Sequence, residues 1–188
     1  MFNRKGYAIL VVILAICVGS VQPATFKGVE MADTMKLDSD TLVLNGMALR
    51  KKLIFKVYVA GLYLPKKETD EKKILGADTK RGAIMHFVRG VGANKINGGW
   101  QDGLKDNTPN HTIDLKKKFD TLCSYMEKVE DGERVEFYYI PNVGTKIIVK
   151  KKEKGIIQGK DFADALFACW IGPKPGPGKG FKADLLGK

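Results

Sequence analysis

Residues 45–65, NGMALRKKLIFKVYVAGLYLP, contain the longest run of strand-forming residues in this chain of 188. Between residues 53 and 64 only Lys56 is charged, and valine, phenylalanine and tyrosine recur. Side chains of these β-branched and aromatic types suit the pleated surface of a sheet. Asn45-Gly46 at one end and Pro65 at the other are turn or bulge signals that interrupt regular structure. We therefore predict a main strand between these two breakers.

Both faces of this strand are mostly apolar. Alternate residues of a strand face opposite sides of the sheet. One face then carries Leu53, Phe55, Val57, Val59 and Tyr63, and the other carries Ile54, Lys56, Tyr58, Ala60, Leu62 and Leu64. A strand of this kind needs cover on both sides. Helices would supply one cover, and the other would be further protein or the lining of an apolar ligand cavity.

The rest of the chain alternates between strand and helix signals without a regular βαβ rhythm. Strands are expected within residues 26–37 with a turn at 32–34, and at 41–44, 81–89, 134–140 and 145–152. Helices are expected at 68–77, 93–106, from Pro109 to 131–132, and from an N-cap at Asp161 to 171, with a last docked turn at 181–186. Early and late strands with helices between and after them indicate an α+β fold, an antiparallel sheet covered on one side by helices.

The N-terminal residues have the order of a secretory signal peptide. Arg4 and Lys5 precede an unbroken apolar run at 7–18, and small residues follow. Twelve helical residues rise ~18 Å, which is short of the ~30 Å hydrocarbon core of a bilayer. We predict a signal peptide at 1–24, a single domain at 25–188, and a periplasmic or secreted location. A retained N-terminal anchor is the alternative, and a lipoprotein at Cys17 is disfavoured by the bulky Ile16 before it.

The formal charge is +11, from 32 basic and 21 acidic residues. Lysines occur in runs at 116–118 and 150–152 and are not interleaved with aromatic residues, as a base-stacking surface would require. We therefore expect no nucleic-acid partner, especially for an exported protein. The runs indicate either a solvated face or a surface attracted to anionic lipid headgroups.

Catalytic and metal-binding motifs are absent from the sequence. There is no Gly-x-Ser-x-Gly, phosphate-binding or dinucleotide-binding loop. The two histidines, His86 and His111, fall in different expected elements, so no metal and no cofactor are predicted, and His86 is interpreted as a packed or hydrogen-bonded side chain. Cys123 and Cys169 form an even pair in an oxidising compartment, but two separate buried thiols are favoured over a bridge.

Two segments carry a resemblance to a known family. Asn45-Gly46, Arg50 and FKVYVAGLYLP at 55–65, together with GKDFADALFACWIGPKPGPGKGFKADLLG at 159–187, resemble the chalcone isomerase-like superfamily, specifically its bacterial exported branch, related to plant fatty-acid-binding members. The resemblance spans roughly residues 26–187. It implies an open-faced β-sandwich with a cleft between the sheet and the helices.

The resemblance also implies a site. Arg50 matches the family's arginine that holds an anionic oxygen of the ligand, and Tyr58 matches the second polar group, which is tyrosine in fatty-acid binders. The tyrosine and asparagine that true isomerases carry on a central helix fall roughly at Ile96 and Gly103, which have no polar side chain. Eight extended residues span ~26 Å, so Arg50 and Tyr58 share a ligand only if the chain folds back or bulges between them.

Three functions remain open at this point. The first is an exported, non-catalytic binder of a hydrophobic anion such as a fatty acid, held by Arg50 and Tyr58 between walls formed by Phe55, Val57, Leu62 and Leu64. The second is an isomerase or intramolecular lyase acting on a chalcone-like substrate. The third is a structural or interaction protein of the envelope. A sealed core with no cavity beside Arg50 would favour the third, and a cavity with polar groups projecting from 93–106 would favour the second.

Overall fold

The computed structural model describes residues 23–188. The expected signal peptide lies outside the described residues except for its last two positions, and so does Cys17. Strands in the described part are β1 (Ala24–Phe26), β2 (Val29–Met31), β3 (Thr34–Leu37), β4 (Asp40–Lys52), β5 (Phe55–Leu64), β6 (Arg81–Phe87), β7 (Arg134–Ile140), β8 (Gly144–Val149) and β9 (Lys152–Ile157). β3 to β9 form one antiparallel sheet in sequence order, and β1 pairs with β2 as a separate hairpin.

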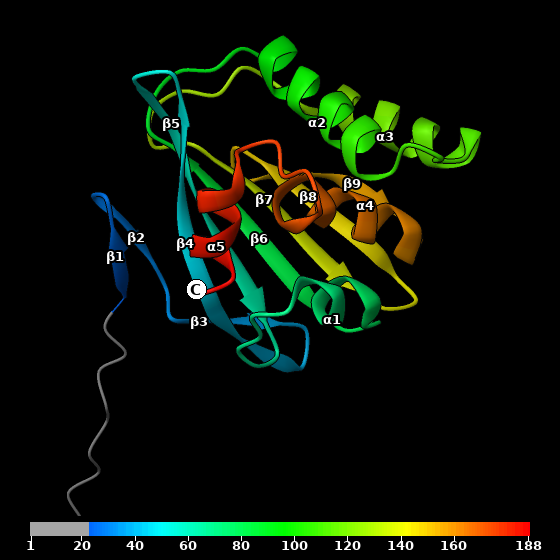
Figure 1. Cartoon of the computed structure of the whole chain (residues 1–188), viewed down its shortest axis with the longest axis horizontal. Helices are drawn as coiled ribbons and strands as arrows, with labels where there is room; N and C mark the ends of the chain where they lie inside the picture. Colours follow the sequence, from blue (N-terminus) through cyan, green and yellow to red (C-terminus); the bar gives the residue numbers. More distant parts are fainter. Residues whose placement is uncertain (1–22) are drawn as a thin grey trace, which may run out of the picture.

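The helices are α1 (Glu71–Gly76), α2 (Ala93–Asn107), α3 (Ile113–Tyr125), α4 (Lys160–Ile171) and α5 (Lys179–Leu185). Figure 1 shows α4 and α5 lying across one face of the sheet, with α2 and α3 above them at the top of the view. The β1–β2 hairpin lies on the side of β4 opposite to α5 (Figure 1). The α+β prediction, an antiparallel sheet covered on one side by helices, is confirmed.

The stretch 45–65 is a hairpin and not a single strand. β4 runs through the expected break at Asn45-Gly46, and the chain reverses at Leu53 and Ile54. The expected short strand at 41–44 is therefore the first part of β4. Two-residue hairpin loops favour asparagine and glycine. Because the loop residues here are Leu53 and Ile54, the sequence contains no signal that a turn lies between them and their neighbours.

Asn45 is a bulge residue that connects the sheet to the C-terminal helix. The pairing of β4 with β5 skips it, since Leu44 pairs with Tyr63 and Gly46 with Leu62. Its side-chain amide donates to the carbonyl of Leu185 at 2.9 Å and to that of Glu68 at 3.0 Å, and its oxygen accepts from the Glu68 N–H. A Cβ at Gly46 would lie 2.7 Å from the Leu185 carbonyl oxygen. The docked tail predicted at 181–186 is thus confirmed, and the bulge holds it in place.

The two faces of β5 bury different cores. Tyr58, Ala60, Leu62 and Leu64 pack with the helices in the larger core. Val59 and Tyr63 pack on the opposite face with Val29 and Met31 of the β1–β2 hairpin. Further protein therefore covers the second face, and the Tyr63 hydroxyl donates to the Ala32 carbonyl at 2.9 Å. The predicted division of β5 holds from Tyr58 onwards.

Several expected boundaries were wrong. α3 begins at Ile113, after the predicted start at Pro109, because Thr112 caps it, and it ends at Tyr125, before the predicted end at 131–132, because Met126 is extended. The predicted strand 145–152 turns at Lys150 and Lys151, both with positive φ, to give β8 and β9. Gly159, and not Asp161, is the N-cap of α4, because its φ of 101° is open to glycine and rarely to other residues.

α4 is the central helix of the fold. Nine of its twelve residues are buried, and it is apolar around most of its circumference, as a helix covered on most sides must be. α2 packs closely on it where Gly103 meets Cys169. α2 is continuous despite its glycines, and Ile96, Trp100 and Leu104, spaced four residues apart, are buried along one face.

Candidate ligand-binding site

A cavity of about 700 Å³ lies where the β4–β5 hairpin, α2 and the loop after α4 meet. Its apolar and aromatic lining comes from Leu53, Phe55, Val57, Tyr58, Met85, Phe87, Val91, Ile96, Trp100 and Trp170. Charged side chains at its edge are Arg50, Lys52, Arg89, Lys95, Asp102 and Asp106. Apolar walls with a few convergent polar groups are typical of small-molecule sites.

Arg50 and Tyr58 are brought together by the hairpin. They are direct partners in the register of β4 and β5, and both line the cavity. Directly opposed residues of an antiparallel pair project to the same face of the sheet. The fold-back that a shared ligand requires is therefore present, although the ligand-binding role of the pair stays a prediction.

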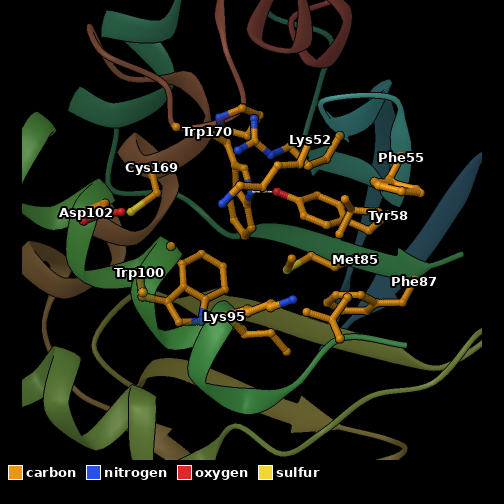
Figure 2. A pocket seen from close by; sticks show the side chains of 18 of the residues that line it. Lys52, Phe55, Tyr58, Met85, Phe87, Lys95, Trp100, Asp102, Cys169 and Trp170 are labelled. Carbon is orange, nitrogen blue, oxygen red and sulfur yellow. Dashed lines mark hydrogen bonds between the residues drawn. The ribbon is translucent and has the colours of Figure 1, made fainter. Parts of the chain in front are cut away.

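The Tyr58 hydroxyl retains a free hydrogen-bond donor. Its oxygen accepts from the indole Nε1 of Trp170 at 3.1 Å, the dashed line in Figure 2. Burial raises the pKa of Tyr58 to about 12, against the weaker opposing effects of the Trp170 hydrogen bond and the Arg50 charge, so the phenol is protonated near neutral pH. The hydroxyl donates to no acceptor within residues 23–188. A ligand oxygen can take this hydrogen bond.

A second bulge shapes the wall of the cavity. Arg50 pairs with Tyr58, but Lys51 pairs with Lys56, so Val57 is an extra residue on β5. A bulge of this kind disturbs the alternation of side chains along the strand. Phe55 and Val57, predicted to face away from Tyr58, consequently line the cavity with it.

The predicted wall was half wrong. Phe55 and Val57 line the cavity, but Leu62 and Leu64 do not. These two leucines lie further along β5, where they are buried in the core beneath the helices. Met85 and Phe87 of the neighbouring strand take their place beside Tyr58 (Figure 2).

The cations of the cavity lack acidic partners. Arg50, Lys52 and Lys95 form no ion pair within 4.0 Å in the part of the chain that the structure describes. The Arg89 guanidinium lies 4.5 Å above the centre of the Phe55 ring. Figure 2 shows Lys52 on the side of Tyr58 and Trp170, and Lys95 near Trp100 and Phe87. Four cations against the two carboxylates of Asp102 and Asp106 give the edge of the cavity a net positive charge, which favours anions.

Two tryptophans form the inner end of the cavity. The rings of Trp100 and Trp170 meet edge to face with centroids 5.3 Å apart. The indole N–H of Trp100 is buried and has no hydrogen-bond partner among residues 23–188. Nothing in the spacing of the two tryptophans along the sequence shows that they share a cavity.

The comparisons with known proteins identify the family. A model of the chalcone isomerase-like family matches residues 23–187. The chain belongs to the chalcone isomerase-like family. The crystal structure of an Arabidopsis thaliana fatty-acid binding protein superposes with a TM-score of 0.68 at 16% identity, covering 88% of this chain and 96% of that chain. Likeness at this identity establishes the shared fold. A search of curated proteins finds no match.

α2 lacks the tyrosine and asparagine of true isomerases, but it directs other polar side chains toward the cavity. Ile96 lines the cavity with an apolar side chain. Gly103 does not line it, and a Cβ there would lie 2.5 Å from the Cys169 sulfur. Lys95 and Asp102, one residue before each of these positions, do line it. Sequence reasoning missed them because a solvated charge on a helix gives no signal of a cavity beside it.

The cysteines and histidines supply no further chemistry to the site. Cys123 and Cys169 are free thiols. Burial raises the pKa of Cys169 to about 12, and its sulfur donates to the Ala165 carbonyl, which keeps it unreactive. His86 accepts a hydrogen bond from Arg134 Nε at 3.1 Å, as a packed side chain does.

Within the described residues no group of three or more His, Cys, Asp or Glu side chains is placed to hold a metal ion. The helices of residues 23–188 are all too short or too polar to cross a membrane.

Proposed function

We propose that this protein is an exported, non-catalytic binder of a hydrophobic anion such as a fatty acid. Arg50 and Tyr58 hold the carboxylate, and the aromatic cavity holds the acyl chain. The observation that carries the proposal is the cross-strand pairing of a cation and a phenol at the edge of one apolar cavity. The family resemblance alone identified the two residues, but it did not show that they lie side by side at one cavity.

The chemistry of the pair suits a carboxylate. A guanidinium offers planar, forked donors that match the two oxygens, and the phenol adds one hydrogen bond. The cavity of about 700 Å³ lies within the ~300–1,000 Å³ of typical ligand pockets. Each methylene transferred from water to such walls contributes ~0.8 kcal/mol. The Arabidopsis protein of the same fold is a fatty-acid binding protein, which supports this ligand class.

The proposal includes export, on the strength of the N-terminal sequence. Arg4 and Lys5 ahead of a short apolar run indicate cleavage that leaves a mature chain beginning between Val21 and Phe26. Intact mass measurement of the protein recovered from a periplasmic fraction tests this directly. A chain that retains Met1 in that fraction would contradict cleavage.

The ligand is tested first without any variant. Native mass spectrometry of the protein purified from its own envelope should show a bound lipid of mass consistent with a long-chain carboxylic acid. Titration of the delipidated protein with a fatty acid and with the fatty alcohol of equal length then isolates the headgroup. The acid should bind at least tenfold more tightly, because only a carboxylate gains from Arg50. Equal affinities would reject the carboxylate site.

A catalytic function is the second candidate, and one observation favours it. Lys95, Asp102 and Asp106 of α2 line the cavity, and such groups can transfer protons. Against it, Ile96 and Gly103 lack the side chains that the true isomerases use. Stereoselective cyclisation of a chalcone well above the spontaneous rate would establish a catalytic function. If no such activity is measured, the non-catalytic binding function remains the proposal.

A further inference from the structure

The two most exposed large hydrophobic residues of the described chain lie at the tip of the β4–β5 hairpin. Leu53 is 89% exposed and Ile54 86%, and the neighbouring Phe55 is 51% exposed. Figure 1 shows this hairpin extending past the rest of the sheet at the end of the molecule where the chain enters α2. Single exposed apolar residues are common, but consecutive ones on a projecting tip mark a contact surface.

The requirements of the turn do not explain these residues. Leu53 has a φ of 54°, a conformation that costs a branched side chain and favours glycine or asparagine. Two-residue hairpin loops are dominated by those small or polar types. Leu53 therefore opposes the local backbone preference, and both Leu53 and Ile54 face water.

A group of cations surrounds the apolar tip. Arg50, Lys51, Lys52 and Lys56 flank it, and residues 41–67 contain no aspartate or glutamate. Lys51 and Lys56 are direct cross-strand partners, an arrangement of like charges that destabilises an isolated hairpin. None of these four has an ion-pair partner within 4.0 Å in residues 23–188.

The lysine runs at 116–118 and 150–152 differ in this respect. Lys116 pairs with Asp120 at 2.8 Å, Lys118 with Asp161 at 2.9 Å, and Lys150 with Glu133 at 3.4 Å. These pairs neutralise much of the charge that the sequence suggested for lipid contact. At the hairpin tip, by contrast, all four neighbouring cations are without an ion-pair partner in residues 23–188.

We infer that the β4–β5 hairpin tip docks on anionic lipid bilayers, with Leu53 and Ile54 entering the interface and the surrounding cations contacting the lipid phosphates. Apolar insertion combined with basic side chains is the chemistry of peripheral membrane binding. A protein partner fits less well, because stable interfaces bury ~1,200–2,000 Å² and this tip is a narrow two-stranded projection. A second copy would bring the same cations together.

Docking at this tip would place the cavity mouth on the membrane. Lys52, Leu53 and Phe55 belong both to the tip and to the lining of the cavity. A lipid could then pass between bilayer and cavity without crossing bulk water. This last step rests on the proposed ligand-binding function, whereas docking itself does not.

Co-sedimentation of the mature protein with vesicles tests the inference. Vesicles of phosphatidylcholine alone are compared with vesicles containing about one third phosphatidylglycerol. Binding should be at least tenfold tighter to the anionic vesicles at low salt and should weaken as salt screens the lysines. Failure to bind anionic vesicles overturns the inference.

Two variants avoid the cavity lining. Ile54→Asn removes an exposed apolar side chain, and Lys51→Gln/Lys56→Gln removes two cations while keeping side-chain length. Each should lower affinity for anionic vesicles by about fivefold or more. Ile113→Asn on α3, which removes a side chain that is 78% exposed, and Lys117→Gln/Lys151→Gln are matched controls that should bind as the wild type does.

Wild-type affinity in both tip variants would reject the tip as the docking element. An equal loss of binding in the matched controls would show an effect that is not specific to the tip and would also reject it. A concentration-dependent dimer in sedimentation equilibrium that Ile54→Asn abolishes would reassign the tip to an interface between copies. Fatty-acid titration without vesicles separates membrane docking from the proposed fatty-acid binding. Tip variants that keep their affinity for fatty acid but lose vesicle binding support docking. Vesicle binding by a protein that takes up no fatty acid supports docking and rejects the ligand-binding function.

Discussion

Arg50 on β4 lies directly across the sheet from Tyr58 on β5, eight positions later in the chain, and both side chains line one cavity. The pairing depends on the reversal at Leu53-Ile54 and on the bulge at Val57. Since Trp170 already donates to the Tyr58 oxygen, the phenol is oriented before any ligand arrives. The pair thus offers a cation and a fixed donor at one edge of an apolar space.

Removing the Arg50 guanidinium should weaken fatty-acid binding by tens-fold. Truncating one partner of a desolvated charge pair costs ~2–5 kcal/mol, and the half-buried position of Arg50 favours the lower part of this range. Arg50→Lys should recover part of the loss, because an ammonium lacks the planar fork. The measurement is titration of a fluorescent fatty acid into each delipidated variant, with circular dichroism to confirm folding.

Lys117→Ala, which removes an exposed cation on α3, is the control for net charge in that series. It should bind as the wild type does. Equal affinities for wild type and Arg50→Ala would assign Arg50 to the surface and leave the cavity without a carboxylate anchor.

Tyr58→Phe should have a smaller effect on binding than Arg50→Ala. The change keeps the ring packed on Phe87 and Phe181, at centroid distances of 5.6 and 6.0 Å, and removes one hydrogen bond to the ligand, worth ~0.5–1.5 kcal/mol. It also leaves the buried Trp170 N–H unpaired, which should lower the free energy of unfolding by ~1–3 kcal/mol. Urea denaturation and fatty-acid titration of the same preparation separate the two effects. A variant as stable as the wild type would mean that water replaces the phenol.

Stability should fall at alkaline pH because of the buried phenols. Burial raises the pKa values of Tyr58 and Tyr63 to about 12 from an ordinary 10.0. Above pH 10 the unfolded chain releases these protons first, so the free energy of unfolding declines as the pH rises from about 10 towards 12. Below pH 10 neither phenol contributes a pH dependence. Thermal melts between pH 8 and 12 should show this decline, and Tyr63→Phe should make it shallower. An unchanged slope in that variant would argue against a buried Tyr63 phenol.

Local sequence predicted the fold class and most elements, but it could not locate the hairpin turn. The apolar positions along β5, β7 and the helices have the spacing that each element requires, so the sheet and its helical cover followed from periodicity. Leu53 and Ile54 carry no turn chemistry, and long-range pairing of β4 with β5 overrides their local preference. The bulge at Val57 likewise exchanges the faces that strict alternation assigned.

The residues that line the cavity were harder to predict from the sequence than the fold was. Arg50 and Tyr58 entered through a family resemblance, not through a pattern in their own neighbourhood. Lys95 and Trp100 lie on α2 and Met85 lies on β6, so these side chains share a surface only after α2 packs beside the sheet. Which side chains border an empty volume depends on such tertiary placement, and residue type alone gives no indication of it.

The contact between Gly103 and Cys169 positions the α2 wall of the cavity. A Cβ at Gly103 would lie 2.5 Å from the Cys169 sulfur and 2.9 Å from its Cβ, so Gly103→Ala must separate α2 from α4. Overpacking of this kind typically costs ~1–3 kcal/mol. Cys169→Ala removes the sulfur and leaves its Cβ, so the double variant should be more stable than the sum of the single changes predicts. A double-mutant cycle by urea denaturation measures this coupling, and Gly98→Ala, where a Cβ meets no atom within 4 Å, is the control. Additive effects in the cycle would mean that the helices relax independently and that this contact does not set the position of Trp100.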